Sequence, residues 1–359
     1  MAPPRQRDGL IPRAAYGAVR AAAFAPRLFG LGASLRGAAA AGRAFGASPL
    51  NRSRVQRAAE RIEVALPDLD APARRELVLH SYEHLAMLAV EVATLSRTVT
   101  PDRWPDRIEL GEMRDALRPI LQRRPIILIT GHCGNWEILG ATLGVVGLPV
   151  HALYRPLDLK PLDQWLRRSR AACGIDLVDK FGATDALPKL MEERQPVAFV
   201  ADQNAGDRGL FVPFFGRLAS TYKTIALLAI AHNADVVCGY AQRLPRAPGK
   251  PWPRYRASIE DAFGPSDYLD QPDPAYYITA RYRRAIETMV RREPDQYLWM
   301  HRAWKSRPLH ERKNAPFPTR LRERLAGLPW MNDADVEVVI DRSNRDAAWL
   351  AETGRDRLP

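Results

Sequence analysis

The stretch that most limits how this chain can fold is residues 125–143, where a continuous apolar run leads into an amphipathic helical pattern. The run at residues 125–130 is short and carries no charged side chain, which is typical of a strand buried on both faces of a sheet. The helical pattern begins at residue 138, after a turn that contains two glycines. A buried strand followed at once by a helix is half of a β–α–β unit, so this stretch predicts a parallel sheet.

The same alternation continues to about residue 260. Further strands are predicted at 150–154, 175–178, 197–201, 236–241 and 255–259. Helices are predicted near 160–172, 184–194 and 221–233, and again at 275–292. We therefore expect an α/β fold with a mostly parallel central sheet flanked by helices. Because the carboxyl ends of parallel strands share one edge, the segments after residues 130, 154 and 201 should line one cleft.

The turn at that edge carries the strongest chemical signal, His132 and Glu137 in Gly-His-Cys-Gly-Asn-Trp-Glu. Positions five apart point away from each other on an ideal helix, so the two side chains meet only if the turn bends. An imidazole held by a carboxylate can take a proton from a hydroxyl. We interpret His132 and Glu137 as the catalytic pair, with backbone N–H groups of the turn holding an oxyanion. The alternative is a core histidine followed by an ordinary acid in the first helical turn.

Three further side chains follow strands or lie close to them. Arg155 ends a strand before a proline and could hold a phosphate or a developing oxyanion. Asp202 follows the strand at 197–201 and could orient an imidazole, orient Arg155, or cap the next turn. Arg170 lies on a predicted helix, where most arginines are simply solvated.

Composition narrows the set of partners. The net charge of +12 indicates an anionic partner, which could be nucleic acid, an acidic membrane surface or an acidic carrier protein. The positive charge is scattered arginine without a nucleic-acid motif, so nucleic acid is not expected. The three cysteines are too few and too scattered for a disulfide framework, which favours a reducing compartment.

Residues 1–50 are rich in alanine, glycine and arginine and contain no apolar run long enough to span a bilayer. The arginines recur every seven residues in two sets, Arg13, Arg20 and Arg27, then Arg36 and Arg43. Two basic amphipathic helices with this spacing would lie in a membrane interface. The alternative is a soluble helical hairpin packed on the domain.

We divide the chain into N-terminal membrane-associating helices at 1–50, a catalytic domain at 51–330, and a tail at 331–359 that we expect to be partly disordered. The helical region 53–97 contains His80, Glu83 and His84, which satisfy the His-x-x-Glu-His zinc pattern. A zinc hydrolase is therefore an alternative function. It would need a third ligand that the sequence does not single out.

Several short sequence blocks, spread over about residues 53–308, together resemble one family, the late acyltransferases of lipid A biosynthesis. The resemblance rests on the Gly131–Glu137 turn, Tyr154-Arg155-Pro156, Arg170 before Gly174, Asp202-Gln203, residues 212–216, and residues 296–302 with Trp304. Cys133 stands where an aromatic residue is usual, and Ala303 where a second basic residue is common.

The resemblance implies a glycerolipid acyltransferase-like fold and transfer of an acyl chain from acyl carrier protein to a hydroxyl of a lipid A precursor, without a cofactor or a metal. It implies a protein at the cytoplasmic face of the inner membrane, beside an anionic surface. Together with the residue analysis it gives His132 and Glu137 as catalytic, and as substrate-binding residues Gly134, Asn135, Arg155, Arg170, Asp202, Gln203 and Arg302.

Two other functions remain open from the sequence. One is a sister acyltransferase that uses acyl-CoA on another glycolipid, such as a phosphatidylinositol mannoside. The other is a membrane adaptor without catalytic activity. Product masses would separate the two acyltransferases, and a His132→Ala variant would leave the adaptor's role intact.

Overall fold

A seven-stranded sheet forms the centre of the protein in a computed structural model that describes residues 17, 24–26, 28–245 and 252–358. Its strand order is β1-β9-β8-β2-β5-β3-β4. The strands are β1 (Ile108–Leu110), β2 (Ile126–Thr130), β3 (Val150–Tyr154), β4 (Ile175–Asp179), β5 (Val197–Val200), β8 (Asp235–Arg243) and β9 (Tyr255–Phe263). All neighbouring pairs are parallel except β8 with β9, so the predicted α/β fold with a mostly parallel sheet is confirmed.

Strand β2 lies inside the sheet because its apolar run can be buried on both faces. It pairs with β5 on one side and β8 on the other, with Thr130 opposite Val200 at the carboxyl end. Ile127 and Ile129 are fully buried, whereas Leu128 between them is only partly buried. Leu128 therefore faces a space that the protein does not fill.

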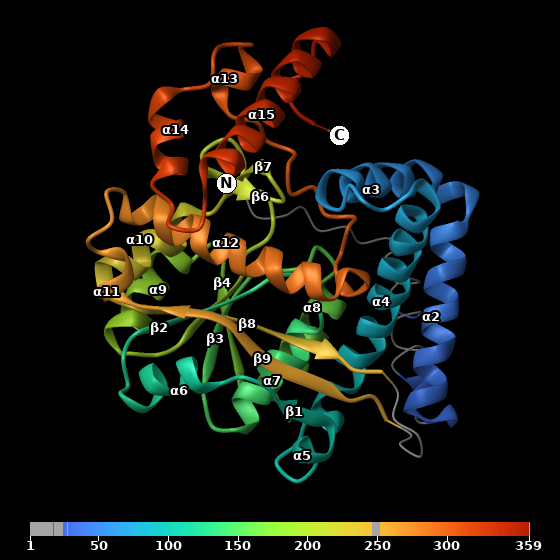
Figure 1. Ribbon diagram of the computed structural model, residues 1–359. Coiled ribbons are helices and arrows are strands. Elements are labelled where there is room, and N and C mark those ends of the chain that lie inside the picture. The colour runs from blue at the N-terminus through green and yellow to red at the C-terminus, as the bar shows by residue number, and fades with distance from the viewer. Residues whose placement is uncertain (1–16, 18–23, 27, 246–251, 359) are drawn as a thin grey trace.

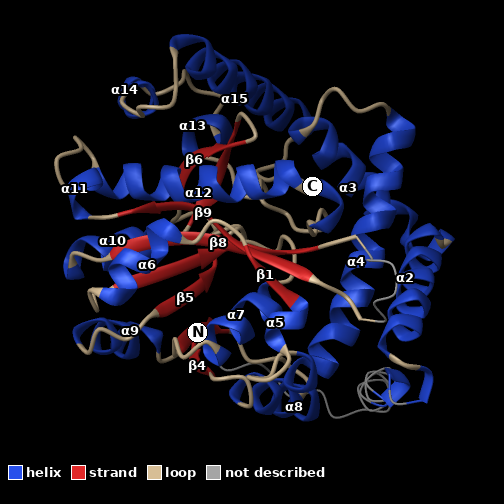
Figure 2. Cartoon of the chain, turned by 60° about the horizontal axis from the view of Figure 1, so that its bottom comes forward, coloured by secondary structure: helices blue, strands red, loops and turns tan. Residues whose placement is uncertain are grey.

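Helices cover both faces of the sheet, with α12 across one face and α7 and α8 on the other (Figure 2). The flanking helices are α5 (Trp104–Arg107), α6 (Arg114–Leu121), α7 (Trp136–Val145), α8 (Lys160–Ala171), α9 (Ala183–Glu192), α10 (Lys223–His232), α11 (Pro265–Tyr268) and α12 (Pro274–Arg292). The larger hydrophobic cluster lies between the sheet and α9, α10 and α12. The carboxyl ends of β2, β3 and β5 line a cavity beside this packing.

The N-terminal helices pack at one end of the sheet (Figure 1). Helix α2 (Leu31–Ala47) leads through the short 3-10 turn η1 (Pro49–Asn51) to α3 (Arg52–Ala65) and the long α4 (Ala71–Thr98), against which α2 packs lengthwise. Arg43 contacts Glu76 and Glu83 of α4 at 2.6 and 2.8 Å. At this arginine the predicted membrane face is therefore a helix–helix contact.

Of the other arginines in the predicted membrane segment, Arg36 lies on α2. Arg13, Arg20 and Arg27 lie outside the described residues. Among the described residues no helix is both long and apolar enough to cross a bilayer.

Two segments differ from the sequence prediction. The aromatic stretch around residues 211–216, for which no strand was predicted, is part of an antiparallel hairpin of β6 (Leu210–Phe214) and β7 (Arg217–Thr221). Beyond the 3-10 turn η2 (Pro294–Gln296), the chain ends in α13 (Leu309–Arg312), α14 (Thr319–Ala326) and α15 (Asp333–Thr353). In place of the partial disorder expected for 331–359, α15 buries Val336, Val339 and Leu350 and packs beside the hairpin.

Candidate active site

The turn between β2 and α7 has a fixed backbone. Gly134 has φ 58°, and a Cβ there would come 2.3 Å from the Ala241 carbonyl oxygen of β8, so only glycine fits. The Asn135 side chain accepts from the N–H groups of Glu137 and Ile138 at 3.1 and 2.9 Å, which caps α7. The turn therefore presents His132 from a rigid support.

His132 is held by an acid from another strand. Its Nδ1 lies 2.6 Å from Oδ1 of Asp202, which follows β5 and is completely buried. Because a carboxylate only accepts, Nδ1 carries the proton and Nε2 is left as the basic atom. The imidazole also packs edge-on against the rings of Trp136 and His301, with centroid distances of 4.7 and 4.3 Å. Its orientation is thus fixed on three sides.

The surroundings of Asp202 keep it ionised. Burial by itself raises the pKa of a carboxyl group, but His132, through charge and hydrogen bond, outweighs burial and holds the pKa of Asp202 below its ordinary value. His301 and the buried Arg283 act in the same direction. For His301, burial and the neighbouring His132 lower the pKa to about 4, so this ring is neutral near pH 7. The site therefore places a charged acid and the neutral His301 imidazole around His132.

Glu137 has a different partner from the one that the sequence suggested. Its carboxylate accepts from Nε and Nη2 of Arg170 at 2.9 and 2.5 Å, and from the Trp136 indole at 3.0 Å. It makes no hydrogen bond with His132 in the described part of the chain. The predicted His132–Glu137 pair is corrected to His132–Asp202, because the first turn of α7 carries Glu137 toward α8 instead.

A second network of buried polar side chains, from α4 and β8, contacts the turn. Arg243, at the end of β8, donates to both oxygens of Glu91 on α4 at 2.7 and 2.6 Å, and to Nδ1 of His84 at 2.8 Å. Glu91 also accepts from the side chain of Asn135 at 2.7 Å, and His84 Nε2 lies 2.9 Å from the Gly134 carbonyl oxygen. These contacts tie α4 and β8 to Gly134 and Asn135 in the turn that presents His132.

The same contacts argue against the zinc-hydrolase alternative. Both ring nitrogens of His84 are engaged, one as acceptor from Arg243 and one as donor to Gly134, so neither is free for a metal. His80 is half-exposed beside Glu76 on the outer side of α4. The His-x-x-Glu-His pattern is therefore part of the scaffold.

One other group in the described chain has the spacing of a metal site. His132, Asp202 and His301 each offer a ligand atom, and these atoms lie within 4.8 Å of one another. The positive charges of Arg283, near Asp202, and Arg61, near His301, oppose a divalent cation there. The group is better suited to handling a proton than to holding a metal.

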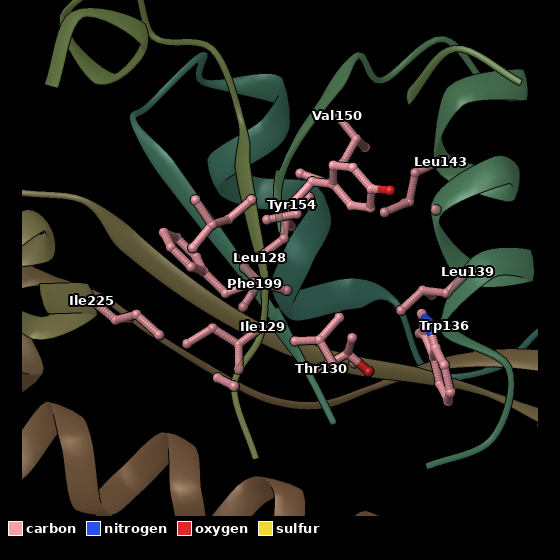
Figure 3. A pocket seen from close by; sticks show the side chains of 18 of the residues that line it. Leu128, Ile129, Thr130, Trp136, Leu139, Leu143, Val150, Tyr154, Phe199 and Ile225 are labelled. Carbon is pink, nitrogen blue, oxygen red and sulfur yellow. The ribbon is translucent and has the colours of Figure 1, made fainter. Parts of the chain in front are cut away.

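His132 opens onto a cavity of about 1570 Å³ that extends along the sheet and is lined mainly by apolar side chains (Figure 3). Leu128 and Phe199 of the sheet and Leu139 and Leu143 of α7 point into it. The volume exceeds the range of about 300–1,000 Å³ usual for small-ligand pockets. A cavity of this size and polarity suits a long aliphatic chain.

The predicted substrate-binding residues divide into two groups. Arg155, Arg170 and Gln203 line the cavity, together with His132 and Glu137. Gly134, Asn135, Asp202 and Arg302 do not line it. The Gly134 and Asn135 amides donate to carbonyls of Gln296 and Ala241 at 2.9 and 2.7 Å, so these two N–H groups of the turn are already occupied. Arg302 is exposed to solvent.

Three residues of the site were not among the candidate site residues predicted from the sequence. His301 lies within the stretch 296–302 that carried the family resemblance, yet only Arg302 was singled out from it. Arg243 ends an apolar strand in the same way as Arg155, which could have identified it. Glu91 is seven residues from His84 on one helix, and a buried acid on the same face as a histidine is a usable signal.

A histidine–carboxylate pair beside a large apolar cavity suits an enzyme that acts on lipid chains. The chain belongs to the bacterial lipid A biosynthesis acyltransferases, because the model of that family matches residues 7–306. The protein is thus an acyltransferase of lipid A biosynthesis, as the resemblance implied.

Curated relatives agree with this assignment. The chain is 27% identical over 254 residues to the lipid A biosynthesis lauroyltransferase of Escherichia coli K12, covering 69% of this chain and 78% of the relative. It is 24% identical over 274 residues to the palmitoleoyltransferase of the same organism, covering 74% and 83%. A lipid A biosynthesis acyltransferase of Haemophilus influenzae is 27% identical over 256 residues, covering 69% and 76%.

Proposed function

We propose that this protein moves a fatty acyl chain from acyl carrier protein to a hydroxyl group of a lipid A precursor, with His132 as general base. The observation that carries the proposal is the His132–Asp202 pair, whose imidazole lines the apolar cavity. The donor's chain would occupy the cavity, which would bring its thioester close to Nε2 of His132. The acceptor hydroxyl approaches from the carboxyl edge of the sheet.

The proposed reaction then needs only groups of this chain and the two substrates. Nε2 of His132 takes the hydroxyl proton as the oxygen attacks the thioester carbonyl, and Asp202 stabilises the imidazolium that forms. The tetrahedral intermediate collapses to the new ester and expels the carrier thiolate, which recovers the proton from His132. Arg155 lines the cavity without an acid partner among the described residues, so its charge is available to the oxyanion.

Glu137 acts in this proposal through Arg170 and not through the histidine. Burial disfavours the charge of Arg170, but the charge and hydrogen bonds of Glu137 raise its pKa. Both side chains line the cavity, so the ion pair fixes the cavity wall next to His132. We treat Glu137 and Arg170 as positioning residues.

A site at the cytoplasmic face of the inner membrane is also part of the proposal. Leu28, Phe29 and Leu50 near the N-terminal helices are 72%, 71% and 95% exposed. Apolar side chains on a chain with a net charge of +12 suit binding to an anionic bilayer surface. The protein would reach its lipid acceptor from that surface.

The test is to incubate the purified protein in detergent with mixed acyl carrier protein thioesters and a lipid A precursor, and to weigh the products. We expect one acyl mass to be added, and no addition by His132→Ala. His80→Ala is the matched control, because His80 is a half-exposed histidine outside the cavity. Full transfer by a folded His132→Ala variant would refute the general-base assignment.

A further inference from the structure

Besides Arg170, four cationic residues line the cavity, and all four are at least partly exposed to solvent. They are Arg155 after β3, Lys180 after β4, Lys305 after the 296–302 stretch, and Arg357 at the C-terminal end. We call Arg155, Lys180, Lys305 and Arg357 the cationic rim. The mechanism proposed above uses only Arg155.

The backbone fixes the rim as two neighbouring pairs. The Lys180 N–H donates to the Tyr154 carbonyl at 2.8 Å, so Lys180 lies next to Arg155. The Leu358 N–H donates to the Lys305 carbonyl at 3.2 Å, and Ser306 pairs with Arg357 as an antiparallel bridge. Leu358 is buried in the main hydrophobic cluster, which anchors Arg357 beside Lys305.

Acids neutralise the rim only in part. Among the described residues, Arg155, Lys180 and Lys305 form no ion pair. Arg357 lies 3.4 Å from Asp207 and 3.7 Å from the exposed Asp356, and Asp207 is shared with Arg312 at 3.9 Å. Arg170, which also lines the cavity, is different because it pairs with the carboxylate of Glu137. A rim with excess positive charge above an apolar cavity fits an amphiphile with an anionic head group.

We propose that the cationic rim is a binding site for a phosphate group carried by a substrate, and that the C-terminal tail completes it through Arg357. The family match ends at residue 306, so it does not extend to Arg357. Phosphate suits the rim because guanidinium and ammonium groups from several segments can share its oxygens. This proposal rests on the proposed function only for the two sources of that phosphate, the carrier's phosphopantetheine and the glycolipid.

Calorimetric binding tests the rim without any catalytic step. Two ligand pairs are titrated into the full-length protein: 4′-phosphopantetheine against pantetheine, and N-acetylglucosamine 1-phosphate against N-acetylglucosamine. We expect the phosphate to tighten binding about tenfold in at least one pair, the effect of one charge-assisted hydrogen bond. The pair that responds identifies the donor or the acceptor as the source.

Variants test which residues produce the gain in affinity from phosphate. Lys305→Ala and Arg357→Ala should each remove most of the gain from phosphate, whereas Arg355→Ala should keep it. Arg355 is the matched control because it stacks on Trp349 of α15, outside the cavity lining. Equal affinity within both ligand pairs, or a gain that survives in Arg357→Ala and Lys305→Ala, would overturn the proposal. If wild-type protein shows the gain but transfers no acyl chain, the proposed function fails and the rim stands.

Discussion

Replacing Glu91 by glutamine should both destabilise the protein and slow acyl transfer. The Glu91 and Arg243 side chains are only 2% and 12% exposed, and they meet through two short hydrogen bonds. Glutamine keeps an acceptor for Asn135, but its amide nitrogen faces the donors of Arg243. Removing one member of a buried ion pair costs about 3–5 kcal/mol, because the other charge stays buried without a partner.

The expected shift can be measured by thermal unfolding. With an unfolding entropy of about 2.1 cal/mol/K per residue over 359 residues, this loss lowers the midpoint by about 4–7 °C. The rate of acyl transfer per folded molecule should fall about tenfold or more, since Asn135 and Gly134 lose their support beside His132. Adding Arg243→Met to the variant should recover part of the stability, because the unpaired charge is then gone.

A matched control separates this effect from the loss of any acid. Glu337 contacts Arg322 at the surface, where the two side chains are 47% and 55% exposed. Glu337→Gln should change the free energy of unfolding by only about 0.5 kcal/mol. If Glu91→Gln melts like Glu337→Gln, the buried network does not stabilise the fold. If the melting temperature of Glu91→Gln falls as expected but its folded fraction transfers acyl chains at the wild-type rate, the network does not position the turn that carries His132.

Three further predictions concern other parts of the site. Arg170→Met and Glu137→Gln should lower the rate of acyl transfer by similar factors, and the double variant should be no slower than either single variant. The three rates test this, because additive losses would mean that the two residues do not act as a unit. Burial lowers the pKa of His84 to about 3 and that of His301 to about 4, so below about pH 6.5 the unfolded chain binds more protons than the folded protein. The melting temperature should therefore fall from pH 7 to pH 5, and a melting temperature that does not change over this range would contradict the argument. Ala198→Leu fills the cavity near the middle of the sheet and should shift products toward shorter acyl chains by mass spectrometry, whereas an unchanged distribution would place the chain elsewhere.

The fold was largely predictable because strands and helices alternate along the chain. β2 matches its predicted limits to within one residue, because its apolar run is buried on both faces of the sheet, and β3 matches its predicted limits as well. The hairpin at 210–221 was missed because Pro213 interrupts its first strand, which reads as a loop until the pairing partner is known.

The proposed catalytic pair, His132 and Asp202, shows which part of the site the sequence could not predict. His132 was identified from its turn, but the acid was assigned by closeness in sequence. Asp202 lies 70 residues away and reaches Nδ1 of His132 only because β2 and β5 are neighbours in the sheet. Strand order is a property of the whole fold, and no local pattern gives it. Asp202 was a candidate for orienting an imidazole, but the sequence could not choose between that role and two others.

The most direct test of the account is the single-turnover rate of acyl transfer by an Asp202→Asn variant. Asparagine keeps the size of the side chain but no longer favours the proton on Nδ1, so Nε2 of His132 loses its role as base. We predict a rate about 10⁴-fold below that of the wild-type protein, by analogy with the same change in other His–Asp pairs. A folded Asp202→Asn variant that transfers acyl chains within about tenfold of the wild-type rate would contradict the account.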